Sequence, residues 1–206
     1  MTGRQRKPMQ QRTQDRVQKA LEAAQQLLLS HGPEEVSIPD VAELAGVPRA
    51  SLYQFFPSKY HLFAAIAEHS MQDCIAALHI GSQAMVGMRW QDALPIMVQA
   101  AQEFFNENPV ASILVLGWPM SRETYLSQET NVVNLADSLR QVFGTFVPAV
   151  VIPESPDAAV IGTEIVFSLF KHSYFMHGRV TDAMCQQAQI ALHGYLQAVL
   201  IPAATH

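Results

Sequence analysis

Residues 36–62 read VSIPDVAELAGVPRASLYQFFPSKYHL, and this stretch contains the local signals that decide the fold. Ser37 is a favourable N-cap residue, and Asp40 three residues later completes a pair that resembles a capping box. Gly46 ends the first helix, because glycine adopts the left-handed conformation at a helix end without a steric penalty. Pro48 suits the start of a second helix, where its missing N–H is not needed. The stretch therefore predicts two short helices joined by a tight turn.

These two helices, expected over residues 38–45 and 49–55, have the arrangement that sets the second helix into the major groove of DNA. The polar groups on the exposed side of that second helix are Arg49, Ser51 and Gln54. Arginine can bond the major-groove edge of guanine, and glutamine can bond that of adenine. Contact with phosphate, or simple solvation, is the alternative role for the same three side chains.

The stretch resembles the DNA-binding core of the TetR/AcrR family of bacterial transcriptional regulators. The resemblance rests on the AGV turn at residues 45–47, the LYQFF run at 52–56, and the Ser58-Lys59 pair that opens the next helix. Upstream, the apolar positions of a helix expected over residues 14–31 fit the first helix of the family. The resemblance covers about residues 13–63, which is under a third of the chain.

Three positions depart from the family pattern. Pro48 stands where the family usually has Ser or Thr, Ala50 where Gly is common, and Tyr60 where Glu is common. All three positions vary within the family, so the departures leave the expected fold unchanged. They leave the details of the groove contacts open.

The resemblance also implies which residues contact DNA. Tyr53 and Lys59 match family residues that hold DNA phosphates, which position the helix without reading bases. A half-buried aromatic ring that braces Phe56 is the alternative role for Tyr53. The expected DNA-binding residues are Ser37, Arg49, Ala50, Ser51, Tyr53, Gln54 and Lys59.

The charge of the chain is divided unevenly along its length. The net charge is −5 over 206 residues, but residues 1–60 hold eight Lys/Arg against six Asp/Glu, so the acidic excess lies beyond them. A basic end on an acidic body suits a protein that binds DNA through that end and limits non-specific attraction to phosphate. With 49% hydrophobic residues, the chain is expected to be globular. We expect no spanning helix, no secretory signal, and buried free thiols at Cys74 and Cys185.

Helical periodicity extends over almost the whole chain, and the sequence predicts an all-α fold of about nine helices. Only the run VVI at 150–152 is strand-like, and it is too short to predict a sheet. We expect a helix-turn-helix domain over residues 13–62 and a helical bundle for ligand binding and dimerisation over 63–206. The expected helices are 14–31, 38–45, 49–55, 58–81, 91–107, 110–117, 123–146, 157–177 and 181–200.

The last two of these helices, 157–177 and 181–200, are apolar on more than one face. A helix that is apolar on most of its circumference is buried on both sides. The family resemblance implies that this pair forms a four-helix bundle with the same pair of a second copy. The sequence therefore predicts a homodimer through these helices.

Aromatic and methionine residues gather in the expected bundle beyond what a minimal core requires. Such a lining suits a largely apolar ligand with few polar anchors, although ordinary core packing explains any single residue equally well. The resemblance implies a pocket for an inducer in this domain. The candidate lining residues are Met71, Phe104, Phe105, Trp118, Tyr125, Phe167, Phe170 and Tyr174.

The sequence contains no constellation that indicates catalysis. Motifs for metalloproteases, phosphate-binding loops, nucleophile elbows and dinucleotide binding are missing. Histidine spacings of five, as between His172 and His177, do not align two ligands on one helical face. We therefore expect no enzyme activity, no metal and no cofactor.

Together these observations predict a cytoplasmic repressor, associated with the nucleoid when it is bound to DNA. It would bind a palindromic operator in double-stranded DNA as a dimer, and a small, largely apolar effector would release it. An activator of the same architecture remains open. The alternative is a helical small-molecule-binding or enzymatic bundle whose N-terminal motif has lost its function.

Overall fold

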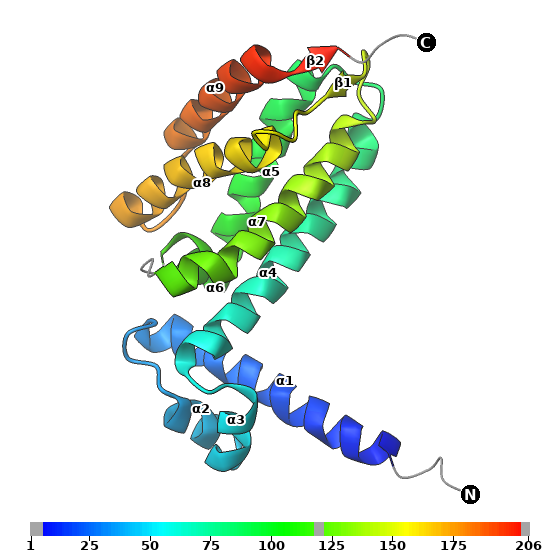
Figure 1. Ribbon diagram of the computed structural model, residues 1–206. Helices are drawn as coiled ribbons and strands as arrows, with labels where there is room; N and C mark the ends of the chain where they lie inside the picture. Colours follow the sequence, from blue (N-terminus) through cyan, green and yellow to red (C-terminus); the bar gives the residue numbers. More distant parts are fainter. Residues whose placement is uncertain (1–5, 118–121, 203–206) are drawn as a thin grey trace, which may run out of the picture. The chain divides into compact units, whose positions relative to one another are not determined.

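The computed structural model describes residues 6–117 and 122–202, with side chains described over 12–117 and 128–201. Within these residues the chain is almost entirely helical (Figure 1), which confirms the predicted all-α fold. The chain divides into two compact units, of which the first ends at Ala67 and the second begins at Glu68.

The first unit contains three helices and the start of a fourth. Their bounds are α1 Arg6–His31, α2 Ile38–Ala45, α3 Arg49–Phe55 and α4 Lys59–Ser82. The helices α1, α2 and α3 all pack against one another. Ala20, Ala24, Val41 and Leu52 of these helices and Leu62 of α4 are completely buried.

The second unit is a bundle built from the rest of α4 and the elements that follow it. These elements are a 3₁₀ turn at Gln83–Met85, α5 Trp90–Glu107, α6 Pro109–Ala111, a π-helical turn at Ser112–Leu116, α7 Arg122–Phe143, α8 Ala158–His177 and α9 Asp182–Val199. The helix α8 packs against both α7 and α9, and α9 also packs against α5. Phe105 of α5 is fully buried, and its ring makes edge-to-face contacts with Phe167 and Phe170 of α8.

Some element bounds differ from the predicted ones. The helix α1 begins at Arg6 instead of residue 14, and α7 ends at Phe143 instead of 146. Just after the end of α7, the hydroxyl and the N–H of Thr145 both donate to the carbonyl of Val142, at 2.7 and 3.0 Å, whereas a continued α-helix would pair that N–H with Gln141. The strand-like run does pair: β1 Val150–Val151 lies antiparallel to β2 Ile201–Pro202, a two-residue ladder at the C-terminal end of the chain (Figure 1).

Candidate DNA interface and ligand cavity

The turn between α2 and α3 is held by the cap residues that the sequence indicates. Ser37 is extended and its Oγ accepts a hydrogen bond from the backbone N–H of Asp40 at 3.4 Å. The same hydroxyl donates to the carboxylate of Asp40 at 2.5 Å. Gly46 has φ 62°, a left-handed conformation that favours glycine, and its N–H bonds the last turn of α2. The two helices are therefore fixed by local bonds at both ends of α2.

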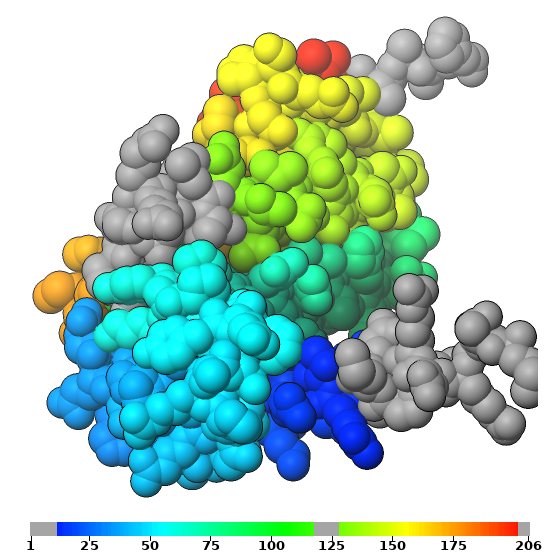
Figure 2. All heavy atoms as spheres, turned by 60° about the horizontal axis from the view of Figure 1, so that its bottom comes forward, coloured from blue at the N-terminus to red at the C-terminus, as the bar shows by residue number. Residues whose placement is uncertain are grey.

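The outward side of α3 carries the residues predicted to contact DNA. Leu52 is completely buried and anchors the helix to the first unit. Arg49, Ala50, Tyr53 and Gln54 are exposed, and their spacing places them on one face of the helix. Tyr53 keeps 48% of its surface exposed, so its ring does not serve as a core residue. Figure 2 shows this side of the first unit, where the surface of α2 and α3 comes forward.

Ser51 and Ser37 differ from these four residues in being half-buried. The hydroxyl of Ser37 is occupied by the cap of α2, as described above. The structure therefore brings four of the predicted DNA-binding residues to one exposed face and gives Ser37 a structural role as well.

Lys59, at the first position of α4, is bonded to the connection between α1 and α2. Its ammonium group donates to the carbonyls of Pro33 at 3.1 Å and Glu34 at 2.9 Å. An ammonium has three donors, so these bonds leave one for a phosphate. Sequence patterns did not indicate that Lys59 also bonds these two carbonyls, because the bonds join residues that lie about 25 positions apart.

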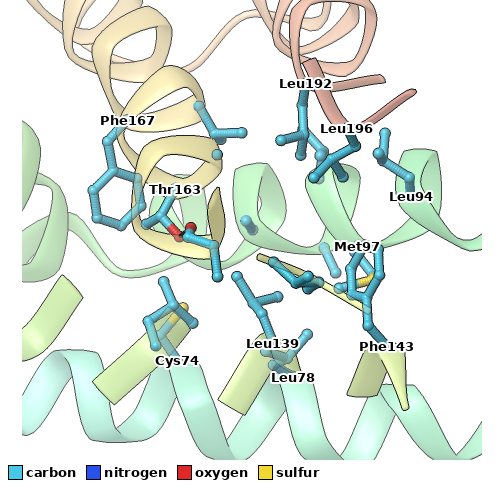
Figure 3. Close-up of a pocket in the computed structure, with 18 of the residues that line it drawn as sticks. Cys74, Leu78, Leu94, Met97, Leu139, Phe143, Thr163, Phe167, Leu192 and Leu196 are labelled. Carbon is cyan, nitrogen blue, oxygen red and sulfur yellow. Dashed lines mark hydrogen bonds between the residues drawn. The ribbon is translucent and has the colours of Figure 1, made fainter. Parts of the chain in front are cut away.

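The second unit encloses a cavity of about 140 Å³, lined by residues of α4, α5, α7, α8 and α9. Figure 3 shows that the lining side chains come from opposite sides of the space, with Leu192 and Leu196 facing Leu78 and Leu139 across it. The lining includes the exposed residues Ala77 and Ala100, so the cavity is not sealed from solvent.

Among the residues predicted to line a pocket, Phe104 and Phe167 line the cavity. Met71, Phe105 and Phe170 are buried in the core and are not part of the lining. The ring of Tyr174 lies against Gly117, where no side chain occupies the space. Trp118 lies outside the described residues, as does the side chain of Tyr125.

Most of the lining consists of aliphatic residues that sequence reasoning did not select. Examples are Leu94 of α5, Leu139 of α7 and Leu192 of α9. An aliphatic residue on a helix gives no sign of whether the space opposite is filled or empty. Gly162 could have been recognised, because a glycine inside an apolar helix often marks a close approach of another chain segment. A Cβ at this position would lie 2.9 Å from Cδ1 of Leu192.

The lining is almost free of polar groups. No Asp, Glu, Lys, Arg or His is among the described residues that line the cavity. Thr163 contributes a hydroxyl, which donates to the carbonyl of Ala159 at 2.9 Å. Cys74 contributes a thiol, and burial raises its pKa to about 12, so it stays protonated and neutral. The cavity therefore offers a neutral, largely hydrocarbon environment.

The helices α8 and α9 expose apolar side chains on their outer surfaces. Phe175 and Met176 of α8 are 66% and 64% exposed, and Ile190 of α9 is 64% exposed. From Ala183 to Val199, α9 contains no Asp, Glu, Lys or Arg. An uncharged surface with large apolar side chains is typical of a protein–protein contact.

The described residues contain no group of three or more His, Cys, Asp or Glu side chains that could hold a metal ion. None of the described helices is both long and apolar enough to span a membrane.

Comparison with known families identifies the helix-turn-helix unit. The sequence profile described as bacterial regulatory proteins, tetR family, matches residues 20–66, which include α2, α3 and the start of α4. The helix-turn-helix unit of the chain is therefore similar to the DNA-binding domain of the tetR family. No curated protein matches this chain in sequence.

Solved structures share the fold of this chain over most of its length. A TetR-family regulator from Streptomyces coelicolor has a TM-score of 0.70 at 20% identity, over 89% of this chain and 99% of that one. A TetR regulator from Rhodococcus sp. RHA1 has a TM-score of 0.68 at 19% identity, over 89% and 96%. RolR in complex with its ligand resorcinol has a TM-score of 0.68 at 14% identity, over 92% and 89%.

Proposed function

We propose that this protein is a regulator of the TetR family: a dimeric repressor that binds an inverted-repeat operator and is released by a small, largely apolar effector. In this proposal residues 13–62 bind DNA, and residues 63–206 bind the effector and form the dimer. The protein acts in the cytoplasm, on the nucleoid when it is bound to DNA. The observation that carries the proposal is the exposed face of α3, which presents Arg49, Tyr53 and Gln54 together.

The DNA contacts divide into two kinds. Arg49 and Gln54 have the side chains that pair with guanine and adenine in the major groove. Tyr53 and the remaining donor of Lys59 are suited to phosphate, which sets the position of α3 without reading sequence. This division predicts that variants at the first pair change sequence preference, whereas variants at the second pair change overall affinity.

The cavity supports the regulatory half of the proposal. An effector can shift the regulator away from DNA only by binding the DNA-incompetent state more tightly than the DNA-competent state. The cavity draws residues from five helices of the second unit, among them α4, whose N-terminal residues belong to the DNA-binding unit. A ligand that changes the packing of α4 in the cavity therefore acts on a helix that both units share.

Selection of bound duplexes from a random pool, using the purified protein, tests the DNA-binding half. We expect recovery of an inverted repeat, with binding that weakens steeply as salt rises because phosphate contacts release counterions. Recovery of no common sequence, together with salt-independent binding, would contradict the proposal. Titration of the selected operator in the presence of candidate ligands then tests the effector half separately.

A further inference from the structure

We propose that the cavity selects uncharged ligands about the size of one six-membered ring, and that the hydroxyl of Thr163 is their hydrogen-bonding anchor. This inference rests on the proposed function, because it specifies the class of the effector. It adds three restrictions that follow from different observations: the charge of the ligand, its volume, and the direction of the hydrogen bond that Thr163 offers.

The restriction on charge follows from the lining. Of the described residues, the cavity is lined by hydrocarbon side chains, two sulfur atoms at Cys74 and Met97, and the hydroxyl of Thr163. A carboxylate or ammonium placed among them would lose its hydration and gain no opposite charge. The Cys74 thiol does not help, because its raised pKa keeps it neutral. Ligands that are ionised at neutral pH are therefore excluded.

The restriction on size follows from the volume of about 140 Å³. An apolar protein cavity of about 150 Å³ accommodates benzene. Gly162 lets α8 approach α9 closely at one wall of this space, since a Cβ there would lie 2.9 Å from Cδ1 of Leu192, and both residues line the cavity. A ligand with a single ring, or a branched chain of similar volume, fits without displacing core side chains.

The direction of the hydrogen bond follows from the existing bond of Thr163. Its hydroxyl proton is donated to the carbonyl of Ala159 at 2.9 Å, so Oγ1 can only accept a bond from a ligand. A ligand hydroxyl is a suitable donor, whereas a ketone or an ether oxygen gains nothing at this position. The cavity therefore favours a neutral hydrocarbon or its monohydroxy derivative.

Four small probes that share one aromatic ring test the charge restriction with the full-length protein. Toluene and p-cresol are neutral at neutral pH, benzoate is an anion, and benzylamine is a cation. We expect calorimetry and ligand-observed NMR to detect binding of the two neutral probes and of neither ion. Equal or tighter binding of benzoate or benzylamine overturns the proposal, and so does failure of both neutral probes to bind.

Variants locate the binding in the cavity. Ala77 lines the cavity and Ala76 does not, yet both are exposed residues of α4. Ala77→Trp should weaken toluene binding at least tenfold, whereas Ala76→Trp should leave it unchanged. Equal effects of the two variants place the probe elsewhere and overturn the proposal.

A second pair of variants tests the anchor. Thr163→Val should weaken p-cresol binding about three- to tenfold, the value of one neutral hydrogen bond, and leave toluene binding unchanged. Thr145→Val is the control, because Thr145 makes the same kind of bond to a helix carbonyl but does not line the cavity. Equal weakening of toluene and p-cresol by Thr163→Val contradicts the anchor.

Operator binding measured in the same samples separates this inference from the proposed function. Probes that bind in the cavity but leave operator affinity unchanged support the ligand class and argue against the effector role. In a third outcome, a charged compound releases the operator from the wild-type protein but not from the Ala77→Trp variant. That result would support the effector role of the cavity and overturn the ligand class proposed here.

Discussion

Asn106 and Val180 exchange two hydrogen bonds, although they lie 74 positions apart in the chain. Asn106 Nδ2 donates to the carbonyl of Val180, and the N–H of Val180 donates to Asn106 Oδ1, each at 2.9 Å. Gln102 donates to the same carbonyl at 3.1 Å and to Asp182 at 2.8 Å. The C-terminal part of α5 is thereby joined to the connection between α8 and α9.

Replacement of Asn106 by Ala should lower the free energy of unfolding by about 1–3 kcal/mol. The reason is that the N–H of Val180, a residue only 1% exposed, would lose its partner in a place where water cannot replace it. Urea denaturation measures this difference. Gln99→Ala is the control, since it removes an exposed bond to Glu103 and should cost about 0.2–0.5 kcal/mol. Similar values for both variants would contradict the structural role of the pair.

The contacts of Asp157 should make the stability of the protein depend on pH. Asp157 caps α8 by accepting bonds from the N–H groups of Ala159 and Val160, and Arg140 donates to its carboxylate. The bond from Arg140 holds the pKa of the Asp157 carboxyl below its ordinary value. Because the folded state prefers the ionised form, this contribution is present above about pH 4 and is lost as pH falls through the lower folded pKa.

The variant Asp157→Asn should therefore be less stable than the wild type near neutral pH and close to it in stability under acid conditions. The amide oxygen still caps the helix, so the difference reports the ionised carboxylate. Urea unfolding at several pH values measures it. Asp137→Asn is the control, because Asp137 bonds the same arginine from an exposed position and should change stability little. If the difference in free energy of unfolding between the wild type and Asp157→Asn stays constant from neutral to acid pH, this account is refuted.

Arg49→Ala tests the outward face of α3. If Arg49 bonds a base, affinity for the selected operator should fall by about 1–3 kcal/mol and preference should relax at one base pair. If it bonds phosphate instead, affinity should fall on all sequences and the salt dependence should decrease by about one unit of slope. Fluorescence anisotropy over a salt series distinguishes the two. Arg89→Ala in the second unit is the control and should leave DNA affinity unchanged. If Arg49→Ala also leaves DNA affinity unchanged, for the operator and for other sequences, the proposed docking face is excluded.

The sequence predicted α2 and α3 well because their bounds depend on local signals. Ser37, Gly46 and Pro48 each act within a few residues, so no distant contact is needed to place them. The π-helical turn at Ser112–Leu116 packs against α8, and β1 pairs with β2, so both elements involve contacts with residues far along the chain. Local patterns do not contain that information.

The same limit explains which pocket residues could be predicted. Adjacent Phe104 and Phe105 have the same chemistry and sit on one helix, yet Phe104 lines the cavity and Phe105 fills the core. Their difference lies in the facing helices: Phe105 meets the rings of Phe167 and Phe170. Sequence periodicity indicates the buried side of a helix, but the shape of the neighbouring helices decides whether space remains.

The exposed apolar surface of α8 and α9 suggests a variant that should break the proposed dimer. Leu192 is unsuitable for this test, because it lines the cavity and a charge there would disturb ligand binding. Ile190 is 64% exposed on the uncharged part of α9, so Ile190→Glu leaves the core of the protomer intact. In a two-fold dimer each interface residue occurs twice, and a desolvated carboxylate facing an apolar partner costs several kcal/mol.

Ile190→Glu should therefore weaken dimerisation at least a hundredfold, which sedimentation velocity at micromolar concentrations detects as a shift from dimer to monomer. Ile80→Glu makes the same chemical change on α4 at a residue that is 77% exposed, outside α8 and α9, and should leave the dimer intact. The monomeric variant should also bind the inverted repeat more weakly than the control, because two linked half-sites reinforce each other. A variant at Ile190 that stays dimeric and binds normally would place the interface on another surface.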